Sequence, residues 1–105
     1  MTGAEKILAE RQRQLSEEGW TEEHDDTHQR AQLNMAAHCY GDLAWRQEKG
    51  LETELNPPPI DWPWGKEWWK PSDDPVRNLE KAGALIAAEI DRIERKRKLH
   101  QDNEA

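Results

Sequence analysis

The chain is poor in apolar residues: 34% of its 105 residues are hydrophobic, 35% are charged, and phenylalanine is absent. A composition this polar is typical of disordered chains unless the apolar residues are clustered. A single cysteine, Cys39, excludes an internal disulfide and a zinc cluster built on thiolates. The sequence has no apolar run long enough to cross a membrane and no signal or lipidation motif, so we expect a cytoplasmic protein without membrane contact.

An excess of positive charge is also lacking, because the net charge is −7. Proteins bind DNA nonspecifically by neutralising phosphates with Lys and Arg, so DNA binding is not expected. Basic residues do gather between Arg92 and Lys98. Cations near the end of a helix complement its dipole, which explains this cluster without a nucleic acid.

The aromatic residues form an unusual set of six tryptophans and one tyrosine. A chain of this length forms one domain, and folding buries only about 65% of its surface, which leaves a thin core. Each buried indole removes a large area from water. We therefore expect a single domain over residues 1–105 whose core depends on a few tryptophans.

The spacing of apolar residues predicts an all-α fold with three helices, at about residues 4–18, 27–46 and 75–98, and a frayed tail at 99–105. Asp74 and Pro75 are typical of a helix start, and Asp26 or Thr27 is expected to cap the second helix. Residues 50–71 hold three consecutive prolines and four tryptophans. We expect this Pro/Trp-rich loop to pack on the three helices.

Each predicted helix has one apolar face. Gly83 interrupts the third face, so an indole or the alanines of the second helix are expected to cross there. Arg11 stands on the first face, from which it either extends to solvent or reaches a buried acid. The faces predicted to be buried hold Ala4, Ile7, Leu8, Arg11 and Leu15, then Leu33, Ala36, Ala37, Tyr40 and Ala44, then Val76, Leu79, Gly83, Ile86, Ile90 and Ile93.

The tryptophans of the loop, among them Trp64, Trp68 and Trp69, allow two interpretations. They either cover the helices and complete the core, or form an aromatic wall for a planar ligand. The first is favoured, since a thin core needs large side chains.

Residues 17–30 combine many acids with two histidines and a tryptophan, more than capping a helix requires. His24 and His28 have the spacing of a zinc-protease helix, but the acid beside His24 is Asp25 rather than Glu and no third ligand follows. Carboxylates spaced as in magnesium-dependent pyrophosphohydrolases occur only within residues 17–30, the acidic bend. A hard cation stays an option here, although neither metal nor cofactor is expected.

Six stretches of the sequence carry one resemblance: Glu10–Gln14, Glu18–Asp26, Ala36–Tyr40, Trp62–Trp64, Trp68–Pro71 and Lys81–Ile90. Together they resemble a family of small proteins of bacteriophages and prophages. The resemblance implies a phage accessory protein in a bacterial host but no particular activity. The family's carboxylates are replaced by amides at Gln32 and Asn78, which favours a binder over a metal enzyme. A fainter likeness, through Gly19-Trp20 with Asp25 and His28, is to the ryanodine-receptor repeat domain.

Two functional hypotheses and one structural alternative follow. The first is a nonenzymatic protein that binds a host protein or an anionic, nucleotide-like ligand; a homodimer also stays open. The second is a metal-dependent nucleotide phosphohydrolase using Asp25, Asp26 and His28. The alternative is a structural ion-pair cluster in which Arg11, Arg77 or Lys81 is buried against Asp25 and Asp26 and so connects the three helices. The binding residues predicted are Arg11, Trp20, His24, Asp25, Asp26, His28, Arg77 and Lys81, with Trp64, Trp68 and Trp69 as a wall.

Overall fold

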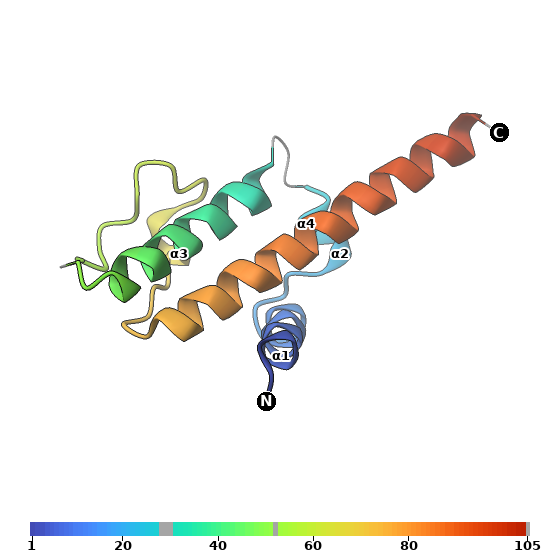
Figure 1. The fold of residues 1–105 in the computed structure, drawn as a ribbon. Coiled ribbons are helices and arrows are strands. Elements are labelled where there is room, and N and C mark those ends of the chain that lie inside the picture. Colours follow the sequence, from blue (N-terminus) through green and yellow to red (C-terminus); the bar gives the residue numbers. More distant parts are fainter. Residues whose placement is uncertain (28–30, 52, 105) are drawn as a thin grey trace.

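The structure is a computed structural model that describes residues 1–27, 31–51 and 53–104. It holds helices α1 (Gly3–Ser16), α2 (Glu22–Asp25), α3 (Gln32–Glu48) and α4 (Pro75–Glu104), and the short 3-10 helix η1 (Lys66–Trp68). These described residues form no strand (Figure 1). The predicted all-α fold is therefore confirmed.

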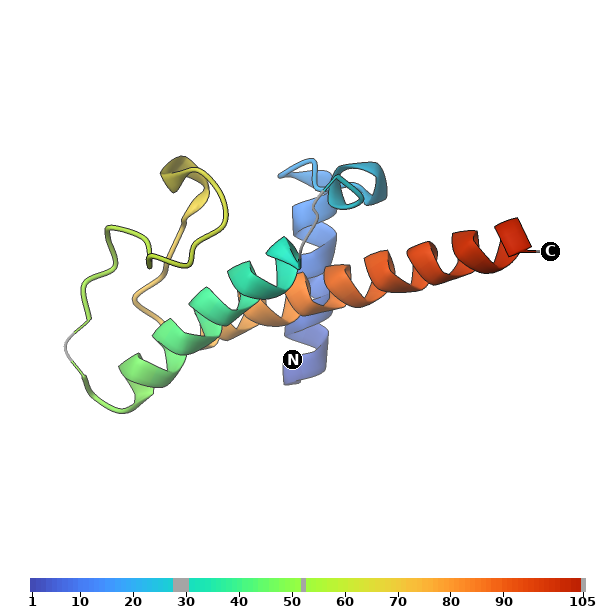
Figure 2. The ribbon, with the colours of Figure 1, turned by 90° about the horizontal axis from the view of Figure 1, so that it is seen from above.

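Helices α3 and α4 lie side by side and form the body of the molecule (Figure 1). Helix α1 crosses α4, and the end of α4 projects well beyond the other elements (Figures 1 and 2). The Pro/Trp-rich loop and α2 lie on one side of the α3–α4 pair, while the N-terminal half of α1 projects on the other (Figure 2). The two sides of the pair are thus covered unequally.

The core is thin, and an aromatic cluster from the loop completes it. Tyr40 stacks on Trp69 with ring centroids 4.7 Å apart, and Trp62 meets both rings edge-on. The indole N–H of Trp69 donates to the carbonyl of Leu55 at 2.7 Å, and the amide of Lys70 donates to the Tyr40 hydroxyl. Trp62 and Trp69 therefore cover the helices, as the favoured interpretation predicts.

The start of α3 differs from the prediction, because neither Asp26 nor Thr27 caps it. Asp26 ends α2 and pairs with Arg95, while the Thr27 hydroxyl donates to the carbonyl of His24 at 2.6 Å. Helix α3 begins only at Gln32, after Ala31 with a left-handed φ of 59°. Both expected caps are engaged in closing α2 instead.

The predicted buried face of α4 is wrong. Leu79, Ile86 and Ile90 are 47 to 55% exposed, and Val76 is exposed as well. The residues of α4 that are buried instead are three alanines, one leucine and two polar residues. They are Asn78, Ala82, Ala84, Leu85, Ala88 and Glu89. Residues 99–104, predicted to be frayed, continue α4.

The predicted face of α1 is also largely wrong. Leu8 and Leu15 are exposed, whereas the polar residues Glu10, Arg11 and Gln14 are buried. Gly83 does mark a close crossing, as expected. The crossing group is Ile7 of α1, since a Cβ at residue 83 would lie 2.6 Å from its Cδ1 atom.

None of the described helices is both long enough and apolar enough to cross a membrane.

The two faces of α4 can be distinguished by a matched pair of leucine substitutions. Leu85 is fully buried, so Leu85→Ala should lower the free energy of unfolding by about 2–5 kcal/mol. Leu79→Ala, at a position 53% exposed, should cost less than about 1 kcal/mol in dilute solution. Urea denaturation followed by circular dichroism measures both, and equal losses would contradict the observed face.

Candidate functional site

One part of the predicted site is a buried ion pair between α1 and α2. A guanidinium nitrogen of Arg11 lies 2.8 Å from Oδ2 of Asp25, whose side chain is fully buried. The other terminal nitrogen of Arg11 lies 3.5 Å from the carbonyl of Trp20. A buried carboxylate is tolerated only when it is paired, so this contact fixes the bend against α1. Arg11 therefore reaches the buried acid, which was one of the two expected alternatives.

Asp26 forms a second, exposed ion pair, with α4. Its carboxylate lies 2.7 Å from a guanidinium nitrogen of Arg95, which also donates to the carbonyl of Glu22. The hydrogen bond that Arg95 donates to Asp26 raises the pKa of Arg95. Together the two pairs attach the bend to both long helices that it meets.

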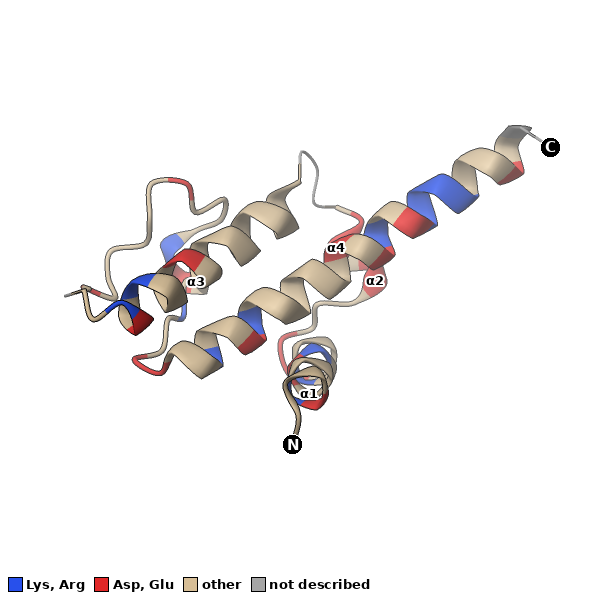
Figure 3. Ribbon diagram, viewed as in Figure 1, with Lys and Arg blue, Asp and Glu red and all other residues tan. Residues whose placement is uncertain are grey.

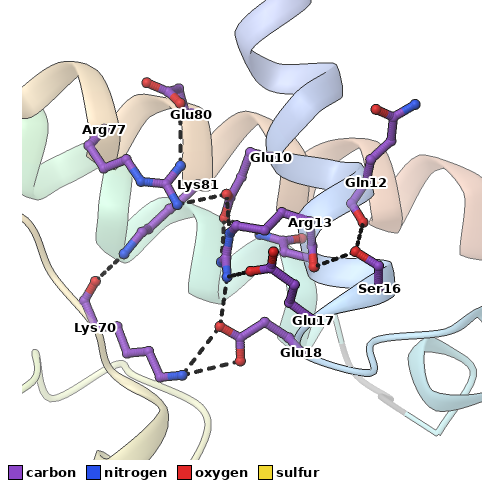
Figure 4. Close-up of polar contacts among 11 residues, drawn as sticks. Glu10, Gln12, Arg13, Ser16, Glu17, Glu18, Lys70, Arg77, Glu80 and Lys81 are labelled. Carbon is purple, nitrogen blue, oxygen red and sulfur yellow. Dashed lines mark hydrogen bonds and ion pairs between the residues drawn. The ribbon is translucent and has the colours of Figure 1, made fainter.

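A third cluster of charges lies between α1, α4 and the end of the loop (Figure 4). Glu10, whose side chain is 1% exposed, accepts from Arg13 and Arg77, each at 2.7 Å. Glu18 accepts from Arg13 and from Lys70, both at 3.1 Å. Glu17 and Glu80 add further ion pairs to Arg13 and Arg77, so each base of the cluster faces a carboxylate. The cluster holds the loop end against α1.

Lys81 belongs to the same region. Its ammonium donates to the carbonyl of Lys70 and lies 5.6 Å from the centroid of the Tyr40 ring (Figure 4). Burial lowers the pKa of Lys81. Arg77 and Lys81 are thus held by Glu10 and by the loop backbone, rather than meeting the acids of the bend as expected.

The remaining predicted residues converge on an aromatic pocket, a cavity of about 280 Å³ lined by Trp20, His24, Trp64, Gly65 and Trp68. The Trp20 and Trp64 rings meet edge-on with centroids 6.0 Å apart. Trp64 in turn contacts Trp62 of the core at 5.4 Å. The indole walls are therefore supported by the aromatic cluster behind them.

The pocket connects the bend with the loop. Thr21 caps α2 by accepting from the amide of His24 at 3.3 Å, which places the imidazole on the pocket side of the bend. Trp68 is 43% exposed, and the ammonium of Lys70 lies 5.7 Å from its ring. Trp69, predicted to belong to the same wall, is instead buried in the core. The tryptophans of the loop therefore divide into two groups: Trp62 and Trp69 complete the core, whereas Trp64 and Trp68 line the pocket.

The cluster of Glu10, Arg13, Glu18 and Lys70 was not predicted as a unit. The spacing of Glu10 and Arg13 indicates a pair within one helix, but the arrival of Lys70 from the loop has no signal in the sequence. Gly65 was likewise missed as a lining residue. A wider cavity on the other side of the loop, next to Cys39, includes only Trp69 among the predicted residues.

No group of three His, Cys, Asp or Glu side chains in the described part of the chain could hold a metal ion. His28 lies outside the described residues. Asp25 and Asp26, the other two ligands of the hydrolase hypothesis, each pair with an arginine.

Comparison with protein-family models, with curated proteins and with solved structures found no match for this chain. The site must therefore be interpreted from its own geometry.

The buried and exposed ion pairs of the bend can be compared with the same substitution at adjacent residues. Asp25→Asn leaves the buried Arg11 without its counter-charge and should cost about 3–5 kcal/mol of unfolding free energy. Asp26→Asn breaks a pair whose acid side chain is 50% exposed and should cost about 0–1 kcal/mol. Chemical denaturation measures both changes, and a smaller loss for Asp25→Asn than for Asp26→Asn would contradict the structural role of the Arg11–Asp25 pair.

Stability should also fall in acid through Glu10. Burial by itself raises the pKa of Glu10, but the hydrogen bonds and charges of Arg13 and Arg77 outweigh it, so the pKa lies below its ordinary value. The resulting stabilisation is complete above the unfolded pKa of about 4.3 and is lost as pH falls through the lower folded pKa. Thermal melts from pH 6 downward should therefore show a steeper acid loss for the natural protein than for Glu10→Gln. Parallel curves would contradict this prediction.

Proposed function

We propose that this protein is a nonenzymatic binding protein whose aromatic pocket takes the planar ring of an anionic, nucleotide-like ligand. The observation that carries this proposal is the convergence of three indoles and one imidazole, from two separate segments of the chain, on one cavity. Ligand pockets are typically lined by aromatic side chains with a few polar groups at their edge.

The size of the pocket limits what enters it. Its volume of about 280 Å³ lies near the lower end of ligand-binding cavities, which begin at about 300 Å³. A single ring system fits this space, whereas a whole nucleotide does not. Stacking of a base on an aromatic side chain contributes about 1–3 kcal/mol, so two or three contacts give useful affinity.

The charged part of the ligand would then remain at the edge of the pocket. Lys70 lies over the Trp68 ring, and His24 lines the cavity. A phosphate at this edge would compete with Glu18 for the ammonium of Lys70, whose side chain is 51% exposed. The protein therefore offers a cation for an anionic group without a metal.

The hydrolase hypothesis has less support. Asp25 and Asp26 already accept from Arg11 and Arg95, and a guanidinium on each carboxylate opposes the binding of a cation there. A role as a phage accessory protein in the bacterial cytoplasm, with a host protein as the alternative partner, rests on the sequence resemblance.

The pocket can be tested with two exposed tryptophans as a matched pair. Trp68→Ala removes one wall and should weaken binding of nucleoside monophosphates about tenfold, since 1.4 kcal/mol of stacking corresponds to tenfold in affinity. Trp45→Ala, on α3 and 57% exposed, should leave affinity unchanged. Isothermal titration calorimetry with the four nucleoside monophosphates measures both.

Two outcomes would contradict the proposal. If none of the four nucleotides binds, or if Trp45→Ala weakens binding as much as Trp68→Ala, the pocket is not the site. Phosphate released from a nucleoside triphosphate by the natural protein but not by Asp26→Ala would establish the enzyme instead.

A further inference from the structure

The largest aliphatic side chains of α4 form an uncovered strip. Leu79, Ile86 and Ile93 are seven residues apart and so lie in one line along the helix, with Ile90 beside them. Leu79, Ile86 and Ile90 are exposed, and Ile93 is half-buried. In a chain with so few hydrophobic residues, this concentration of exposed apolar surface on one helix needs a partner.

The packing of the other helices leaves this strip accessible. Helix α3 covers the side of α4 that holds Asn78, Ala82 and Leu85. Helix α1 crosses at Gly83, and the loop and α2 lie behind the α3–α4 pair (Figure 2). On the opposite side, the N-terminal half of α1 projects past α4 and adds the exposed Leu8.

We propose that the strip binds the same strip of a second copy, with the two α4 helices antiparallel. Leu79, Ile86, Ile90 and Ile93 recur at intervals of seven, four and three residues, whereas Gly83 between them is covered by Ile7 of α1. Those intervals are the pattern by which one helix packs along another, and a second α4 offers the matching pattern over the same length.

The distribution of charge determines the direction. Acids Asp73, Asp74 and Glu80 flank the start of the strip, where Arg77 and Lys81 are already engaged with Glu10 and with the loop backbone. Lys96, Arg97 and Lys98 follow its end (Figure 3). A parallel pair would place like charges side by side. An antiparallel pair places the basic end of each helix beside the acidic start of the other, and it also opposes the two helix dipoles.

The strip supplies part of the area that a stable dimer needs, because a standard interface buries about 800 Å² per partner. The exposed Val76 and Leu8 add apolar surface on the same two helices. The projecting end of α4 and the projecting N-terminal half of α1 would supply the remainder (Figure 2). Obligate interfaces of this kind are mostly apolar.

The proposal predicts that the natural protein sediments as a dimer at micromolar concentration. Ile86→Lys and Ile90→Lys each place a charge in the centre of the interface and should raise the dissociation constant at least 100-fold. Ile60→Lys is the control, because Ile60 is 99% exposed in the loop and far from the strip in the sequence. Sedimentation velocity measures the dimer fraction.

Since Ile86 and Ile90 are already exposed in the single chain, both variants should keep their helix content and remain folded monomers. A monomeric natural protein, or a dimer that persists in both variants, would overturn the proposal. A dimer lost equally in Ile60→Lys would also overturn it.

Cysteine cross-linking tests the direction. In the antiparallel pair Ile86 lies near the two-fold axis, so Ile86→Cys should form a disulfide between the copies on mild oxidation. Leu79→Cys should not, because position 79 then faces the far end of the partner's strip. Cys39 is buried and contributes little background. Equal cross-linking at positions 79 and 86 would overturn the antiparallel arrangement.

Discussion

Helices α3 and α4 meet mainly through alanines, and this close contact decides where the larger side chains go. Ala36, Ala37, Ala82 and Ala88 are all buried, and Leu33, Leu43, Leu85 and Tyr40 supply bulk around them. A contact between small residues brings two backbones near each other but buries little area. The helices therefore depend on apolar groups from elsewhere.

The loop supplies these groups on one side of the pair. Trp62 and Trp69 complete the core against Tyr40, and the hydrogen bonds of Trp69 and Tyr40 fix the loop backbone. Trp64 stands on Trp62 and faces Trp20. The aromatic pocket is thus an extension of the core cluster. Away from the loop, Ile86 and Ile90 of α4 are left exposed.

The charged residues hold the elements that the thin core cannot. Asp25 fixes α2 to α1 through Arg11, Asp26 fixes it to α4 through Arg95, and Glu10 gathers Arg13 and Arg77. Much of the acidic bend is therefore structural, which is the alternative that the sequence left open. Within the bend, Trp20 and His24 line the aromatic pocket.

The sequence by itself determined the all-α class, the apolar face of α3, the start of α4 at Asp74 and Pro75, and the close crossing at Gly83. These follow from helical periodicity, from capping and from the absence of a side chain, which are local properties of the chain. It also named Trp20, His24, Trp64 and Trp68, because their residue types are unusual in a bend and a loop.

Only the tertiary structure decided which face of α4 is buried. The apolar pattern identifies the face of α4 that gains most from burial. In the single chain, however, α4 packs on α3 through a different face, which carries the alanines. The pattern of one helix does not show which face its neighbour will contact. The partners of Asp25, Asp26 and Glu18 were decided in the same way, since Arg11, Arg95 and Lys70 reach them only when segments distant in the sequence are brought together.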